Sequence, residues 1–107
     1  MPVTVTVTPS SPKAKVDACR VTVAGADQND TGAPVPDTYP VQAEKRYYLA
    51  FEKGGAEKGR SYVFGVSETG GHEFNGYVFP ESGTFVVHLR DKTNDSSAGN
   101  SGNVTVT

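Results

Sequence analysis

The sequence predicts an all-β domain, a sandwich of two antiparallel sheets built from seven short strands. Composition is the first observation: of 107 residues, fifteen are Val and eleven are Thr, whereas two are Leu and none is Ile. Val and Thr lose side-chain freedom in a helix but pack well on a pleated sheet. The second observation is the alternation of apolar and polar residues in short segments, which Gly, Pro and Asn interrupt. A helical bundle is therefore not expected.

Each predicted strand is a segment of alternating apolar and polar residues that turn-forming residues bound on both sides. The first repeats Val-Thr three times, so that its valines share one face and its threonines the other. In the fourth, Tyr62, Phe64 and Val66 are expected on one face, after a turn over residues 53–59. The seven predicted strands are 3–8, 16–24, 45–52, 60–67, 73–79, 84–90 and 104–107.

Two long loops interrupt this pattern within a single predicted domain, residues 1–107. Residues 25–44 are rich in Gly and Pro, and residues 91–103 form a polar, low-complexity stretch. A loop of about twenty residues in a small domain is uncommon and usually functional. The terminal strands carry no charge, although natural sheet edges are usually protected by charges, Pro or bulges. We expect these two strands to pair with each other; the alternative is an edge kept for a partner.

Seven short alternating strands in about 100 residues are typical of an immunoglobulin-like sandwich. The segment Glu81-Ser82-Gly83-Thr84-Phe85-Val86-Val87-His88-Leu89 resembles the corner and sixth strand of that family. Phe85 stands where the tyrosine of the corner would be, and Val87 stands where the second cysteine would be. Cys19, on the second strand, consequently has no disulfide partner, and the third strand lacks the buried Trp. These departures argue against an antibody-type domain.

Few residues offer catalytic chemistry, and we do not expect an enzyme. Gly54, Gly59, Arg60 and Ser61 come within one substitution of a phosphate-binding loop, but a strand pattern follows them and the lysine is missing. We therefore interpret this segment as a glycine-rich hairpin turn. Neither of the two histidines has a metal-ligating residue at suitable spacing, and alternation places His88 on an outward face. A net charge of −2 and the lack of a long apolar run predict neither nucleic-acid nor membrane binding.

No cofactor is expected, and calcium is the best of the weak metal hypotheses. The two long loops would lie at the same end of an immunoglobulin-like sandwich, and Ca²⁺ prefers hard oxygen ligands. The simpler interpretation is that Asp and Asn form turns. The candidate ligands are Asp27, Asn29, Asp30 and Asp37 from the first long loop and Asp91, Asn94 and Asp95 from the second. Basic residues would gather at the opposite end: Lys13, Lys15, Lys53, Lys58 and Arg60.

A solitary immunoglobulin-like domain without a disulfide or catalytic site resembles the small immunoglobulin-like proteins of tailed-bacteriophage virions. Residues 1–4 show no signal-peptide pattern, so synthesis in the host cytoplasm is expected. Within that group the chain looks most like a capsid decoration protein, which implies a place on the virion surface. The implied partner is the major capsid protein, with self-association of copies on the shell. The 25–44 segment is expected to dock, with Val35, Tyr39 and Val41 as apolar contacts.

Two alternatives remain. A carbohydrate- or cell-surface-binding module would present aromatic side chains such as Tyr48 or Tyr77 on one flat face for stacking on sugars. An immunoglobulin-like appendage of a phage tail-tube protein would be fused to an upstream domain. The flanking genome would separate these alternatives from a capsid decoration protein.

Overall fold

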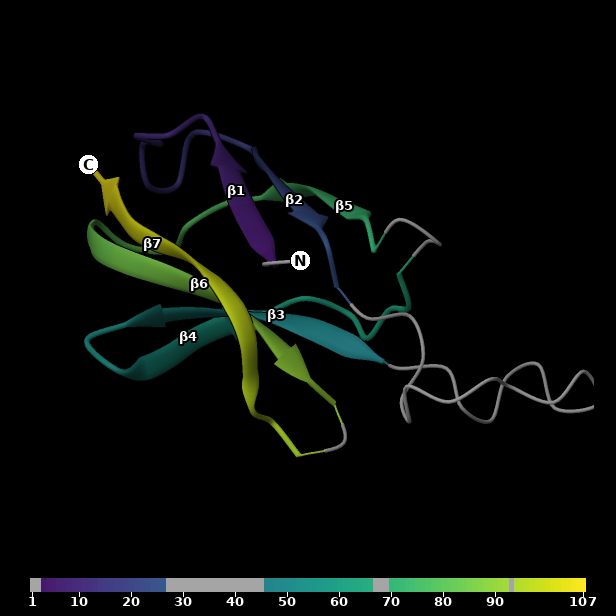
Figure 1. Ribbon diagram of the computed structural model, residues 1–107. Helices are drawn as coiled ribbons and strands as arrows, with labels where there is room; N and C mark the ends of the chain where they lie inside the picture. The colour runs from purple at the N-terminus through teal and green to yellow at the C-terminus, as the bar shows by residue number, and fades with distance from the viewer. Residues whose placement is uncertain (1–2, 27–45, 67–69, 93) are drawn as a thin grey trace, which may run out of the picture.

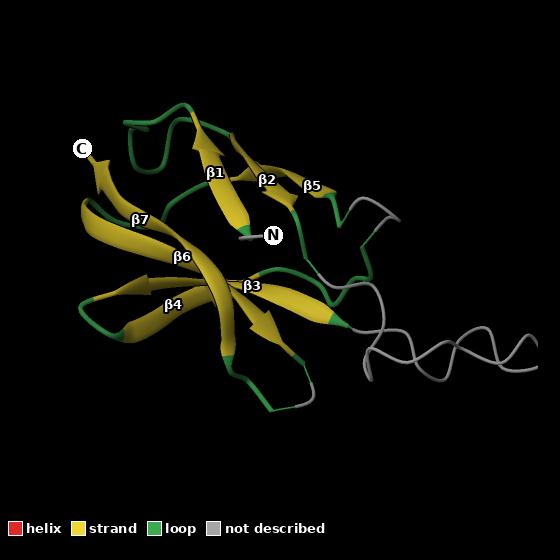
Figure 2. Ribbon diagram, in the orientation of Figure 1, coloured by secondary structure: helices red, strands yellow, loops and turns green. Residues whose placement is uncertain are grey.

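The computed structural model describes residues 3–26, 46–66, 70–92 and 94–107, and in this part of the chain seven strands form two antiparallel sheets (Figure 1). Figure 2 shows strands joined by loops, with no helix in the described part. The strands are β1 (Thr4–Thr8), β2 (Cys19–Ala24), β3 (Tyr47–Lys53), β4 (Ala56–Arg60), β5 (His72–Tyr77), β6 (Gly83–Asp91) and β7 (Ser97–Val106).

One sheet has the strand order β1-β2-β5, and the other has the order β4-β3-β6-β7. The two sheets face each other as the layers of a sandwich, which confirms the predicted fold class. This order is consistent with an immunoglobulin-like topology in which the fourth strand belongs to the larger sheet. Cys19 on β2 and Val87 on β6 are both buried.

The core lies between the sheets and is built from the alternating apolar residues that the sequence indicates. Phe85, Val87 and Leu89 of β6 are completely buried. A chain of aromatic rings continues from this core toward one side of the sandwich. Phe51 stacks on Tyr77 with ring centroids 3.6 Å apart, and Phe79 meets the Phe51 ring edge-on at 5.9 Å.

The terminal strands do not pair with each other, so that prediction is wrong. β1 pairs with β2 through residues 4–8, and β7 pairs with β6 in the other sheet. The two strands still approach closely. A Cβ atom added at Gly99 of β7 would lie 2.9 Å from Cγ1 of Val3, the residue before β1. β1 and β7 are thus edge strands that lie against each other along one side of the sandwich.

The fourth and seventh strands differ in extent from their predictions. β4 covers residues 56–60 rather than 60–67, because Gly54 and Gly55 both have positive φ (60° and 82°) and form a tight two-residue turn after β3. β7 begins at Ser97, so much of the predicted 91–103 loop is strand. Its polar residues are compatible with a strand because sheet pairing uses the backbone, and most of their side chains are exposed.

Candidate functional site

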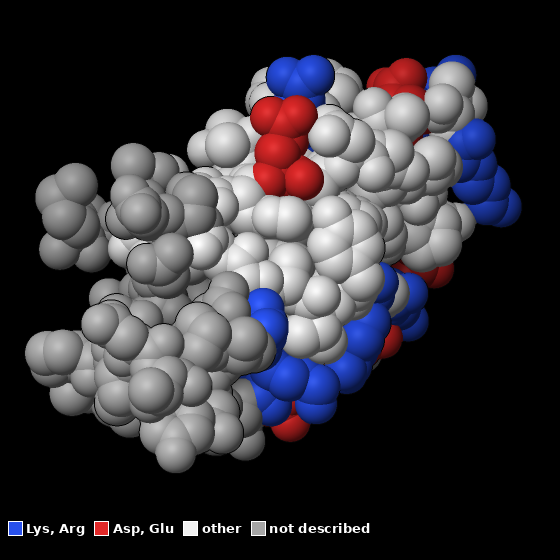
Figure 3. All heavy atoms as spheres, turned by 90° about the vertical axis from the view of Figure 1, so that its right-hand side faces the viewer, with Lys and Arg blue, Asp and Glu red and all other residues white. Residues whose placement is uncertain are grey.

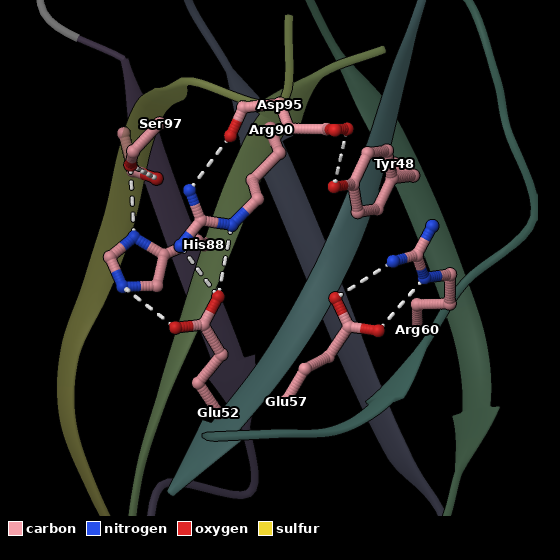
Figure 4. Close-up of polar contacts among 9 residues, drawn as sticks. Tyr48, Glu52, Glu57, Arg60, His88, Arg90, Asp95 and Ser97 are labelled. Atoms are coloured by element: carbon pink, nitrogen blue, oxygen red, sulfur yellow. Dashed lines mark hydrogen bonds and ion pairs between the residues drawn. The ribbon is translucent and has the colours of Figure 1, made fainter. Parts of the chain in front are cut away.

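A network of polar side chains crosses the outer face of the four-stranded sheet (Figure 4). Arg90 of β6 donates to Oε2 of Glu52 on β3 from both Nε (2.9 Å) and Nη2 (2.6 Å). Its Nη1 donates to the backbone oxygen of Asp95 at 2.9 Å. The hydroxyl of Tyr48 donates to Oδ1 of Asp95 at 2.9 Å. One arginine therefore connects β3, β6 and the turn before β7.

Tyr48 is only 2 % exposed although it points away from the core. The guanidinium of Arg60 covers its ring, 4.5 Å from the centroid, and is itself held by bidentate hydrogen bonds to Glu57. Burial, together with the hydrogen bond to Asp95, raises the pKa of Tyr48 above its ordinary value. Tyr48 therefore offers no flat ring to a sugar, which corrects the expectation for this residue. Tyr77 is half-buried, and one face of its ring stacks on Phe51.

His88, in the same network, has the neighbours of a hydrolytic triad but not its geometry. Its Nδ1 lies 2.9 Å from Oγ of Ser97, and its Nε2 lies 4.0 Å from Oε1 of Glu52. The second distance is too long for the hydrogen bond that would orient a catalytic base, and Arg90 already balances the Glu52 charge. Ser97 is exposed on an edge strand. This arrangement fastens adjacent strands together, and it does not support nucleophilic chemistry.

One edge of the sandwich, between β4 and β5, exposes an apolar surface. We call Tyr62, Val63, His72 and Phe74 the Tyr62 surface. Tyr62 is 56 % exposed and Val63 is 47 % exposed, while His72 and Phe74 are half-buried. The Tyr62 ring meets those of His72 and Phe74 edge-on, at 5.7 and 5.3 Å between centroids. Figure 3 shows an uncharged area on this side, bordered by charged side chains.

A backbone bulge produces this surface. Ala50 of β3 opposes Arg60, and three residues earlier Tyr47 opposes Phe64, so the facing segment contains one extra residue. Ser61 occupies the irregular point: its N–H donates to the oxygen of Leu49 at 2.8 Å, and its Oγ accepts from the N–H of Leu49 at 2.8 Å. The bulge shifts the alternation, so that Tyr62 and Val63 are both exposed.

His72 is held in the Tyr62 surface by aromatic contacts. Its ring stacks on Phe64 with centroids 3.9 Å apart, and its Nε2 lies 3.0 Å from the hydroxyl of Tyr62. Burial lowers the pKa of His72 below its ordinary value. A neutral imidazole keeps this surface apolar at neutral pH. The sequence analysis missed this cluster; the signal in the sequence was the run of three adjacent apolar residues after Ser61, which breaks the alternation.

The predicted calcium and docking residues are only partly described. Asp27, Asn29, Asp30, Asp37, Val35, Tyr39 and Val41 lie outside the described residues. Of the other candidates, Asp95 accepts from Tyr48, and Oδ1 of Asn94 accepts from the N–H and hydroxyl of Ser96. Asp91 is buried at the end of β6, and its backbone oxygen accepts from the N–H of Asp95 at 2.7 Å. Asn94 and Asp95 thus build a turn, and the described part of the chain holds no group of three acidic, His or Cys side chains that could bind a metal.

The resemblance to a phosphate-binding loop does not produce one. Gly54 lies in the β3–β4 turn and Gly59 lies within β4, so the segment is a hairpin, as predicted. Lys53 and Lys58 lie 3.4 and 3.7 Å from the same carboxylate oxygen of Glu81. The N–H of Lys15 donates to the oxygen of Phe79 at 2.9 Å, which places Lys15 near this corner. Three of the five predicted basic residues therefore lie at one end, where Glu81 offsets part of their charge.

A shallow depression of about 330 Å³ lies at the ends of β1, β2 and β5. Nε of Arg20 donates to Oδ1 of Asn75 there at 3.1 Å. Burial raises the pKa of the Cys19 thiol, and the charge of Asp17 acts in the same direction. A protonated thiol is a weak nucleophile, so the depression provides no reactive group of this kind. Its lining residues are Thr8, Pro9, Ala18, Cys19, Arg20, Asn75 and Gly76.

The described chain is thus a two-sheet β-sandwich whose most unusual feature is an exposed apolar surface beside an edge strand. No protein-family model, curated protein or solved structure matches the chain, so its class rests on the fold itself. None of the described elements is a helix long and apolar enough to cross a membrane.

Proposed function

We propose that the protein is a non-catalytic structural domain that binds other proteins, and specifically a decoration protein on the outer surface of a bacteriophage capsid. The observation that carries protein binding is the Tyr62 surface. Exposed apolar side chains that are adjacent in space mark contact sites more often than scattered ones do. The assignment to a capsid rests on the resemblance of the sequence to small immunoglobulin-like virion proteins.

The state of the polar groups supports a binding role over a catalytic one. In the described residues, no buried side-chain nitrogen or oxygen lacks a hydrogen-bond partner. The largest polar cluster, around Glu52 and Arg90, is satisfied by its own members. The hydrogen bonds of this network join its own side chains and the Asp95 backbone, whereas Tyr62 and Val63 gain free energy when a partner removes them from water.

In this proposal the protein makes two contacts on the shell. The segment 25–44, with Val35, Tyr39 and Val41, docks on the major capsid protein, and the Tyr62 surface contacts a neighbouring protein of the assembly. A Pro-restricted segment loses less entropy when it is ordered on binding than a flexible one does.

Co-sedimentation with assembled shells of the major capsid protein tests this function. Wild-type protein should pellet with shells and reach saturation, and deletion of residues 28–40 should abolish pelleting. Val16→Ser is a matched control, because Val16 is exposed to 64 % but lies outside both contacts. Saturable binding that survives the deletion would show that the docking segment is wrong. A wild-type protein that never pellets with shells would remove the capsid proposal.

A further inference from the structure

Among the strands that the structure describes, β5 is an edge strand. It pairs with β2 on one side, and no other described strand pairs with it on the other. The sheet to which β5 belongs has three strands, one fewer than the sheet it faces. A further strand can therefore be added at this edge.

The apolar side chains next to β5 would be covered by such a strand. Phe74 of β5 is half-buried, and its ring contacts those of Phe51 and Tyr62 at 6.2 and 5.3 Å between centroids. Tyr62, whose ring contacts those of His72 and Phe74, is 56 % exposed on the same side. Backbone pairing and apolar burial would thus act together, as in other interfaces formed by strand addition.

The other edges are less suitable. β4 presents Glu57, Lys58 and Arg60 within five residues, and charges protect a sheet edge from pairing. β1 and β7 lie against each other where Gly99 meets Val3.

The sequence of β5 is complementary to itself. An antiparallel pair of β5 strands with the two-fold axis at Phe74 would place Glu73 opposite Asn75 of the second copy. Within one chain, Nδ2 of Asn75 already donates to Oε1 of Glu73 at 3.1 Å, so these two groups match chemically. His72 would lie opposite Gly76, which has no side chain to obstruct it. An axis at Glu73 would instead oppose two carboxylates, which destabilises a strand pair.

We propose that β5 pairs with β5 of a second copy, antiparallel about a two-fold axis at Phe74, and that this contact covers the Tyr62 surface of both copies. The contact is isologous, so it closes on itself and yields a dimer rather than a filament. The inference deepens the proposed function, because it names a second copy as the neighbour that the Tyr62 surface contacts. The pairing itself requires no capsid.

Sedimentation velocity of the purified chain over a wide concentration range tests the pairing. Wild-type protein should shift reversibly from monomer to dimer as concentration rises. Tyr62→Ser should raise the dimer dissociation constant about tenfold or more, as expected for an aromatic contact within an interface, and Val16→Ser should leave it unchanged. A wild-type chain that stays monomeric at every concentration would overturn the proposal.

Charge substitutions at Asn75 test the register. Asn75→Asp places a carboxylate opposite Glu73 of the second copy and should weaken the dimer, whereas Asn75→Lys should strengthen it. Thr105→Asp, exposed in the other sheet, is the control for the charge change. Equal weakening by both Asn75 variants would exclude the axis at Phe74, provided that their urea midpoints match wild type. Binding to shells is a separate result. A protein that dimerises but does not pellet with shells would support this inference and remove the capsid assignment.

Discussion

The Glu52–Arg90 pair should contribute measurably to stability. The two side chains are 12 % and 23 % exposed, between the fully buried and fully exposed cases. Breaking a buried pair costs about 3–5 kcal/mol, and exposed pairs contribute about 0–1 kcal/mol. We therefore expect Arg90→Met to lower the free energy of unfolding by about 1.5–3 kcal/mol, because it leaves the Glu52 carboxylate largely desolvated. Glu52→Gln should cost less, since Arg90 keeps its bond to the Asp95 backbone.

A double-mutant cycle measured by urea unfolding separates the pair from its surroundings. The double variant Arg90→Met/Glu52→Gln should cost less than the sum of the single variants by about 1–2 kcal/mol. The Glu57–Arg60 pair is the internal control: its side chains are 33 % and 52 % exposed, so its coupling should be clearly smaller than that of the Glu52–Arg90 pair. Equal coupling energies for the two pairs would refute the reasoning, because burial would then not decide the strength of the interaction.

Three further predictions concern the core and the pH dependence of stability. Phe51→Ala should lower the free energy of unfolding by about 3–5 kcal/mol in urea titrations, because Phe51 is completely buried among other rings; a loss below about 1 kcal/mol would contradict its central position. The pKa of His72 is lower in the folded chain, so the unfolded chain binds a proton first as the pH falls below about 6.5, and the free energy of unfolding should decrease there. In His72→Gln the urea midpoint should fall less steeply with pH. An unchanged slope would contradict the assignment to His72. The pKa of Tyr48 is higher in the folded chain, so the folded state is favoured below about pH 10, and this contribution should be lost as the pH rises through the folded pKa. Tyr48→Phe should make this alkaline decrease in stability shallower. At neutral pH the same variant should lower the free energy of unfolding by about 1–2 kcal/mol, because it loses the hydrogen bond to Asp95.

The strands that bury one face were predictable from the sequence. Alternation identified β1, β2 and β6 because their inward valines, phenylalanine and leucine are separated by exposed or half-buried residues. β4 was misplaced because it is a charged edge strand, and its side chains carry no apolar period. β7 was recognised only over its last residues, since the preceding part is held by backbone pairing with β6 and its side chains are mostly polar.

The candidate sites were harder to predict for a different reason. The network at Arg90 depends on which strands are neighbours in the sheet, and alternation within one strand does not contain that information. Tyr48 illustrates the difficulty, since it points outward but is buried under Arg60. The Tyr62 surface depends on a single extra residue in one strand, which no period in the sequence reveals.

The bulge at Ser61 has a consequence for how the exposed surface can change. Its hydroxyl takes the place of a backbone acceptor for Leu49, so this one side chain fixes the phase of every residue that follows it up to Phe64. A strand without the extra residue would continue the regular alternation, and Tyr62 and Val63 would fall on opposite faces. An insertion or deletion of one residue between Arg60 and Phe64 can thus create or erase the contact surface while every residue that forms it stays the same. Related chains could therefore acquire different binding surfaces by changing which face of the strand each side chain occupies, with the surface residues themselves unchanged.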